Sequence, residues 1–87
     1  MKTEMEIRTT IRQFVLENFL MGDTSSMLKD GESFVATGTI DSIGILEVTY
    51  FLETIFALQV DDRDLVPENL DSVNNLTQYV LRRQYAA

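Results

Sequence analysis

Residues 38–47, Gly38-Thr39-Ile40-Asp41-Ser42-Ile43-Gly44-Ile45-Leu46-Glu47, change from a polar loop to an apolar helical pattern. Asp41 or Ser42 can cap the first free backbone N–H groups of a helix, because each side chain accepts hydrogen bonds. The apolar residues that follow recur at helical spacing and form one face, made of Ile45, Val48, Leu52, Ile55 and Phe56. We therefore predict a helix from residue 41 or 42 to about residue 58, with Ser42 at its start.

Upstream, residues 5–19 carry another helical pattern with polar side chains opposite the apolar ones. The apolar face of this first helix is made of Ile7, Ile11, Phe14, Val15 and Phe19. The polar residues after Gly22 end the helix, and the pattern up to Thr39 is aperiodic, which predicts a long loop. Long loops in compact domains are usually functional or pinned, so we expect Leu28 and Phe34 to dock on the helices. An unanchored connector fits the same residues.

Downstream, Asp61 or Asp62 can cap a short turn through Leu65, which Pro67 should stop because proline lacks an N–H. The last helix begins after Ser72. Its inward residues are Val73, Leu76, Thr77 and Val80, and its final turn holds Arg82 and Arg83, where the helix dipole favours cations. No strand pattern competes. The predicted fold is all-α: a small four-helix bundle with three main helices, one short helix and a long loop between helices one and two.

The chain of 87 residues suits a single domain spanning residues 1–87. Lys and Arg number 7 against 14 Asp and Glu, a net charge of −7, which repels nucleic acids and anionic membranes and favours basic partners. Charged residues interrupt every apolar run near the N-terminus, so we expect a soluble, cytoplasmic monomer. With no Cys and no His, the chain lacks a thiolate, a soft metal site and a Ser-His pair. A hydrolase using Ser42 would need a Lys, a carboxylate or an outside base instead, and it is disfavoured because no second segment of the sequence offers a base or an oxyanion pocket.

The tripeptide Asp41-Ser42-Ile43, placed after a helix and a loop, resembles the prosthetic-group site of acyl carrier proteins. In that family an Asp-Ser pair followed by Leu, Ile or Met opens the second helix. The resemblance extends over residues 7–81, because the short acidic turn and the closing helix follow in the family's order. Residues 37–42 and 65–73 look more similar to free-standing carriers of specialised or aminoacyl-transfer pathways than to the fatty-acid-synthase carrier.

The resemblance implies a non-catalytic carrier in which Ser42 holds a 4′-phosphopantetheine arm through a phosphodiester. The arm's thiol would hold an acyl or aminoacyl group as a thioester, and a phosphopantetheinyl transferase using coenzyme A and Mg²⁺ would attach the arm. Further implied partners are an acyl- or aminoacyl-loading ligase and a downstream synthase or transferase. The location suits a phosphate, because a helix N-terminus offers free N–H groups and a positive dipole end. Asp41 is expected either to cap the helix or to help the transferase hold its metal, and the two roles are compatible.

Ile43, Leu46, Glu47 and Tyr50 lie at helical positions i, i+3, i+4 and i+7, a stripe leading away from Ser42. We predict that partners dock on this stripe and that Glu47, Glu53 and the acidic residues Asp61 and Asp62 meet Lys or Arg of a partner. Alternatively, the glutamates are simply solvated and Ile43 and Leu46 belong to the core. A second function hypothesis is an acidic helical interaction module that uses this stripe without modification.

Three smaller expectations follow from neighbouring residues. Gly44 in the first helical turn should cost about 0.5–1 kcal/mol relative to Ala and loosen the surroundings of Ser42. A cavity for an alkyl chain among Ile45, Val48, Phe51 and Leu76 is one interpretation of residues that core packing explains equally well. The acidic residues Asp61, Asp62 and Asp64 lack the spacing of an EF-hand, so a solvated, capped turn is favoured over a calcium site.

Overall fold

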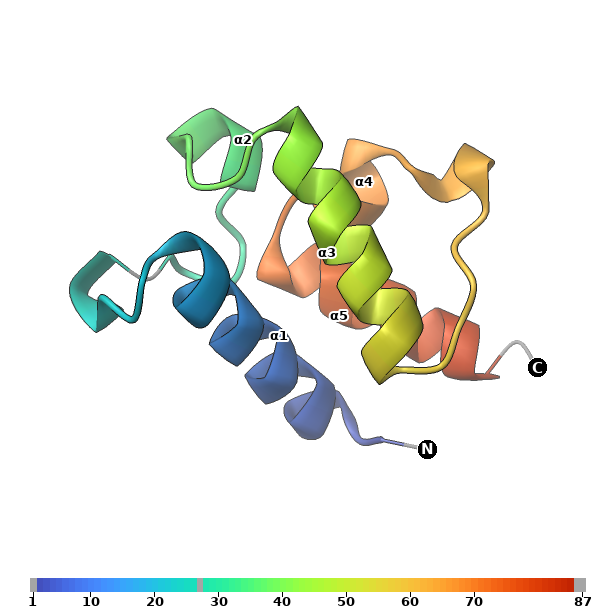
Figure 1. The fold of residues 1–87 in the computed structure, drawn as a ribbon. Coiled ribbons are helices and arrows are strands. Elements are labelled where there is room, and N and C mark those ends of the chain that lie inside the picture. Colours follow the sequence, from blue (N-terminus) through green and yellow to red (C-terminus); the bar gives the residue numbers. More distant parts are fainter. Residues whose placement is uncertain (1, 27, 86–87) are drawn as a thin grey trace.

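The computed structural model describes residues 2–26 and 28–85, and within them it contains helices and turns but no strand (Figure 1). The long helices are α1 (Glu4–Phe19), α3 (Ser42–Ile55) and α5 (Val73–Tyr85). Two single-turn helices, α2 (Phe34–Thr37) and α4 (Pro67–Leu70), and two 3-10 turns, η1 (Thr24–Ser26) and η2 (Asp62–Asp64), lie in the connections. The all-α prediction is confirmed. No helix in this part of the chain is long and apolar enough to cross a membrane.

The first predicted helix is confirmed, and α1 begins one residue earlier than expected, at Glu4. Thr3 and Glu6 form a capping box, in which each side chain accepts a hydrogen bond from the other residue's backbone N–H, at 3.2 and 2.9 Å. After Leu20 the chain turns back on itself, and the N–H of Gly22 donates to the carbonyl of Leu16 at 2.9 Å. Gly22 has φ 79°, a left-handed conformation that glycine adopts without strain.

The long helices enclose one cluster of buried apolar side chains, with α1 and α4 packed against α5 (Figure 1). The fully buried members of this core include Ile7, Ile11 and Val15 of α1, Val48 and Leu52 of α3, and Val73, Leu76 and Val80 of α5. Thr77 is also buried, and its hydroxyl donates to the carbonyl of Val73 at 2.8 Å. The inward face predicted for the last helix is therefore confirmed.

The predicted loop between the first two long helices contains more structure than its sequence pattern indicated. Ser33 caps α2 by accepting a hydrogen bond from the N–H of Ala36 at 3.0 Å, so residues 34–37 are helical where we predicted loop. Asp71, far away in the sequence, holds this turn: its carbonyl accepts from the N–H of Phe34 at 2.9 Å and its carboxylate from that of Val35 at 3.0 Å. Because the contacts that fix this turn come from a residue far away in the sequence, residues 34–37 show no local pattern that would predict a helix.

The loop is pinned rather than unanchored. Phe34 is fully buried and Leu28 packs against the core, as predicted. Asp30 adds a polar anchor, because its carboxylate pairs with Arg8 at 2.9 Å and with Arg12. The carbonyl of Asp30 accepts from the N–H of Asn74 at 2.8 Å. These contacts tie the loop to both α1 and α5, and the unanchored interpretation is wrong for the described residues.

Helix α3 ends three residues earlier than predicted, at Ile55 instead of about residue 58. Phe56 is its C-cap and Ala57 takes a positive φ of 52°, which turns the chain out of the helix. Of the predicted apolar face, Val48 and Leu52 are buried, and Ile45 and Phe56 pack against the core. Ile55 is 47% exposed, so its assignment to that face was wrong.

The acidic connection after α3 forms the predicted short turn, η2, in which Asp61 holds the N-cap position but makes no side-chain cap hydrogen bond. The hydroxyl of Tyr79 donates to the carboxylate of Asp64 at 2.9 Å and fastens the turn to α5. Burial and this hydrogen bond raise the pKa of Tyr79 to about 12. Pro67 opens α4 rather than only stopping the preceding turn, because the first residue of a helix needs no N–H partner.

Candidate functional site at the start of α3

Ser42 is the first residue of α3, and its side chain is exposed. Asp41 is the N-cap: its backbone is extended, with φ −89° and ψ −178°, and its Oδ1 accepts from the N–H of Gly44 at 2.8 Å. The predicted capping role of Asp41 is therefore confirmed. Because Asp41 occupies the cap, Ser42 is left outside the capping interaction, as an exposed residue at the mouth of the helix.

Ser42 differs from the other serines of the chain in what its hydroxyl does. Ser25 and Ser26 donate to the carboxylate of Asp23, at 2.6 and 2.8 Å, and Ser33 donates to Asp71. Ser72 is buried, and its hydroxyl accepts from the N–H of Asn75 at 3.0 Å. Within residues 2–26 and 28–85, the Ser42 hydroxyl makes no hydrogen bond. It is the serine hydroxyl that the fold leaves available.

Gly44 lies in the first turn of α3, where the side chains of Ile40 and Phe19 approach the backbone closely. A Cβ at this position would meet Cγ2 of the buried Ile40 at 2.7 Å and Cε1 of Phe19 at 3.1 Å. Gly44 is itself buried. Instead of loosening the surroundings of Ser42, as predicted, the glycine lets the first turn of α3 approach α1 closely.

We expect Gly44→Ala to destabilise the protein, although alanine is the better helix former. The gain in helix propensity is about 0.5–1 kcal/mol, whereas overpacking a filled core costs typically about 1–3 kcal/mol. Urea unfolding followed by circular dichroism should show a lower midpoint with an unchanged slope. A higher midpoint would mean that the side chains of Ile40 and Phe19 move aside at little cost. The close approach of α3 to α1 would then not require a glycine at position 44.

A pocket of about 490 Å³ lies directly beside Ser42, between α2, α3 and α4. Apart from Ser42, its lining is largely apolar and consists of Ser33, Val35, Ala36, Ile45, Leu65, Val66, Pro67, Leu70 and Asp71. Of the residues predicted to surround an alkyl-chain cavity, only Ile45 lines this pocket. Val48 and Leu76 are fully buried in the core, and Phe51 stacks on Phe14, so the predicted set does not form a cavity of its own.

The predicted stripe on α3 is exposed. Ile43 is 73%, Leu46 59% and Tyr50 71% exposed, so the alternative that Ile43 and Leu46 belong to the core is wrong. Glu47 is exposed beside them. Glu53 is half-buried, and its carboxylate accepts a hydrogen bond from the N–H of Val60 at 3.0 Å. Asp61 and Asp62 are exposed, and Oδ2 of Asp61 forms an ion pair with Nη2 of Arg63 at 3.7 Å.

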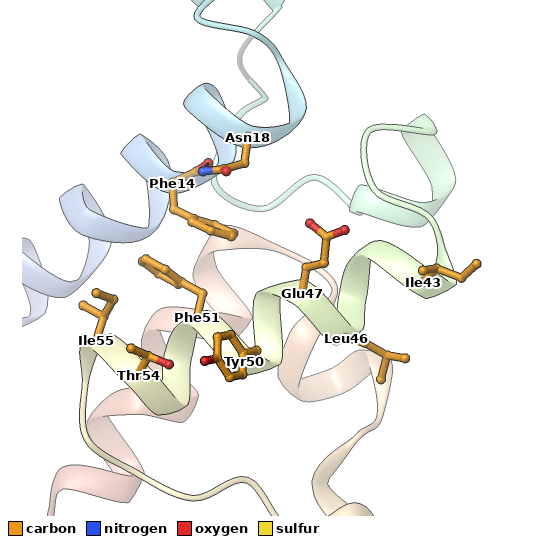
Figure 2. Close-up of a pocket in the computed structure, with 9 residues that line it drawn as sticks. All are labelled: Phe14, Asn18, Ile43, Leu46, Glu47, Tyr50, Phe51, Thr54 and Ile55. Atoms are coloured by element: carbon orange, nitrogen blue, oxygen red, sulfur yellow. Dashed lines mark hydrogen bonds between the residues drawn. The ribbon is translucent and has the colours of Figure 1, made fainter.

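The stripe forms one wall of a groove that sequence reasoning did not find. Figure 2 shows this groove between α1 and α3, about 570 Å³ in volume. We call it the α1–α3 groove; it is lined by Phe14, Asn18, Ile43, Leu46, Glu47, Tyr50, Phe51, Thr54 and Ile55. Phe14 and Phe51 stack with their ring centroids 3.9 Å apart and an interplanar angle of 20°. Helical spacing placed Phe14 on the inner face of α1 but gave no signal for this contact with α3.

Comparison with known proteins adds no assignment. No protein-family model matches the sequence, and no curated protein matches it significantly. The function is therefore argued from the residues at the start of α3 and the surfaces around them.

Proposed function

We propose that this chain is a non-catalytic carrier of the acyl carrier protein type, in which Ser42 bears a 4′-phosphopantetheine arm. When bound, the arm supplies a thiol that holds an acyl or aminoacyl group as a thioester. The observation that carries the proposal is that Ser42 is exposed at the first position of α3, with no hydrogen bond from its hydroxyl within the described residues, and lines a largely apolar pocket. In this proposal, α1, α3, α4 and α5 are the four helices of a carrier bundle acting in the cytoplasm.

The backbone around Ser42 suits a phosphodiester. The N–H of Gly44 is taken by Asp41 and the N–H of Ile45 donates to the carbonyl of Asp41 at 3.0 Å. The N–H groups of Ser42 and Ile43 make no hydrogen bond within the described residues, so they remain free to face an anion. Free N–H groups and the positive end of the helix dipole stabilise a phosphate at such a position.

The pocket beside Ser42 supports the same proposal, because it offers an apolar surface within reach of a group attached to the hydroxyl. Val35 and Leu65, 54% and 37% exposed, stand at this pocket. Contiguous apolar surface that is exposed often marks a site that another molecule covers. An arm attached to Ser42 would find apolar surface on α2 and α4, and also along the exposed stripe of α3.

The proposal is tested by incubating the purified protein with a broadly specific phosphopantetheinyl transferase, coenzyme A and Mg²⁺ and measuring the intact mass. We expect a single addition equal to one phosphopantetheine. A wild-type mass that stays unchanged under conditions in which a known carrier is fully modified would remove the proposal. A native sample that already bears the arm would support it without incubation.

The Asp41→Asn variant separates the capping role of Asp41 from a role in holding the transferase's metal. Asparagine caps helices about as well as aspartate, so the free energy of unfolding should change by only a few tenths of a kcal/mol. If the carboxylate also helps to hold Mg²⁺, the modification rate should fall markedly while the unfolding midpoint stays in place. An undiminished rate would leave Asp41 with the cap alone.

The second candidate function is an acidic helical interaction module that acts without modification. It is favoured by the exposed apolar stripe of Ile43, Leu46 and Tyr50, which a partner could cover whether or not Ser42 is modified. The two functions differ in their need for Ser42: a carrier fails in the Ser42→Ala variant, whereas an interaction module keeps its activity. In the carrier proposal the partners are the transferase, a loading ligase and a downstream synthase or transferase, each with a basic docking surface.

A further inference from the structure

We infer that Asp71 is a positioning residue for Ser42: it fixes α2 and, through α2, the segment that enters α3, so that Ser42 is held in one place. Asp71 follows α4 and lies far from Ser42 in the sequence, yet both residues line the same pocket. The placement of Ser42 follows from the fold alone. Its consequence for modification rests on the proposed carrier function.

Asp71 holds three consecutive residues at the start of α2. Its carboxylate accepts hydrogen bonds from the hydroxyl of Ser33, the N-cap of α2, and from the N–H of Val35, the latter at 3.0 Å. Its carbonyl accepts from the N–H of Phe34 at 2.9 Å. Hydrogen bonds to a carboxylate are stronger than those between neutral groups, and Asp71 is half-buried. One residue therefore fixes both the cap and the first turn of α2.

Further backbone hydrogen bonds connect this turn to the start of α3. The carbonyl of Phe34 accepts from the N–H of Thr39 at 2.9 Å and from that of Ile40 at 3.3 Å. Gly38 makes this reversal possible, because it takes a positive φ of 77°, and its own N–H donates to a carbonyl of α2 at 3.1 Å. In Figure 1 the reversal joins α2 to the beginning of α3. The chain that leaves α2 is thus bonded to a residue that Asp71 holds.

Ile40 links this turn to the helix that carries Ser42. Its side chain is buried and lies against the first turn of α3, where its Cγ2 is the atom nearest to the position that a Cβ of Gly44 would take. Only Asp41, the N-cap of α3, separates Ile40 from Ser42. Because consecutive Cα atoms are a fixed distance apart, a residue two positions from such an anchor has little freedom. The position of Ser42 is therefore set by contacts that begin at Asp71.

The other carboxylate that anchors this loop does not reach the segment before Ser42. Asp30 pairs with Arg8 and Arg12, and its carbonyl accepts from the N–H of Asn74. Within the described residues its hydrogen bonds go to α1 and α5 and none goes to α2. Asp30 therefore offers a matched control: the same side chain in the same connection, with charged contacts of its own, but without contact to residues 33–42.

The position of Ser42 matters for the proposed modification because the reaction is a displacement at phosphorus. The Ser42 oxygen would form a bond to the phosphorus atom that carries the pantetheine, the pyrophosphate bond of coenzyme A would break, and adenosine bisphosphate would leave. The hydroxyl proton passes to a base outside this chain. Misplacing a reacting group by about 1 Å can slow a reaction about a hundredfold. A shifted Ser42 on an otherwise unchanged surface should therefore lower kcat of the transferase and leave KM nearly unchanged.

The test measures steady-state kinetics of the transferase with the full chain as substrate, at a temperature at which thermal melts show every variant to be folded. Asp71→Ala should lower kcat about tenfold and change KM less than about twofold. Asp71→Asn keeps an oxygen that can accept from the N–H of Val35, so it should recover part of the loss. Asp30→Ala should stay within about twofold of the wild-type kcat, although it removes two ion pairs.

Amide signals in ¹H–¹⁵N NMR spectra report the position of the segment without any enzyme. Asp71→Ala should shift the signals of Thr39, Ile40 and Ser42, and Asp30→Ala should leave them in place. Unshifted signals at residues 39–42, an unchanged kcat in Asp71→Ala, or an equal loss of kcat in Asp30→Ala would each overturn the inference. A wild-type protein that is never modified would remove the carrier proposal, and the NMR shifts would still decide whether Asp71 fixes Ser42.

Discussion

Replacing Phe34 by alanine should lower the free energy of unfolding by about 3–5 kcal/mol, the usual cost of deleting a buried aromatic side chain. Phe34 is fully buried, and it opens the single turn α2 that joins the first two long helices. Its backbone N–H donates to the carbonyl of Asp71, so the ring and the main chain fix the same turn. Proteins have only about 0.05–0.15 kcal/mol of stability per residue, so this loss is a large share of the total.

The free energies of unfolding of Phe34→Ala and of its control, Val35→Ala, are measured by urea unfolding. Val35 is the next residue in the same turn, but it is 54% exposed, so its truncation should cost less than about 1 kcal/mol. Both variants remove apolar atoms from α2, and only one of them leaves a cavity. Equal losses in the two variants would mean that the connection between α1 and α3 does not depend on the Phe34 ring.

Replacing Ser42 by alanine should abolish transfer of phosphopantetheine completely, with little change in stability. The hydroxyl of Ser42 makes no hydrogen bond within the described residues and Asp41 supplies the cap, so the fold does not need this oxygen. Alanine is also a good residue for the first turn of a helix. The measurement is intact mass after incubation with the transferase, paired with a thermal melt that shows the variant to be folded.

Ser72 provides a matched control inside the same chain. It too follows an aspartate and precedes an apolar residue at the start of a long helix, in the tripeptide Asp71-Ser72-Val73. Ser72 is only 4% exposed, however, and its hydroxyl caps α5 by accepting a hydrogen bond from the N–H of Asn75. Ser72→Ala should therefore lose about 1 kcal/mol of stability, as an uncapped helix does, and still be modified at Ser42. Loss of modification in both variants would point to a requirement for the overall fold instead of for one serine.

The helices that the sequence predicts well are those whose buried residues repeat along one element. Ile7, Ile11 and Val15 recur every four residues on α1, and their burial follows from that spacing alone. The cap of α3 by Asp41 is similarly local, because a side-chain oxygen and the N–H it meets lie three residues apart. Local features of this kind placed Ser42 at the mouth of a helix.

Features that depend on distant partners could not be derived from the sequence. The α2 turn is held by Asp71 and the preceding loop by Asp30 with Arg8, contacts between residues far apart in the chain. In the α1–α3 groove Phe14 contacts Phe51 across two helices, and helical spacing gives only the face of each residue, not its neighbour on another helix. The close approach at Gly44 was missed for the same reason, since its constraint comes from Phe19 and Ile40.

Fragment mass spectrometry of the transferase-treated protein tests the central claim most directly, because it locates the added group on a residue. Digestion should yield one modified peptide, with the phosphopantetheine ester on Ser42 and none on Ser25, Ser26, Ser33 or Ser72, whose hydroxyls are engaged within the fold. Addition at any other residue, or a fully unmodified Ser42 peptide under conditions that load a known carrier, would contradict the account.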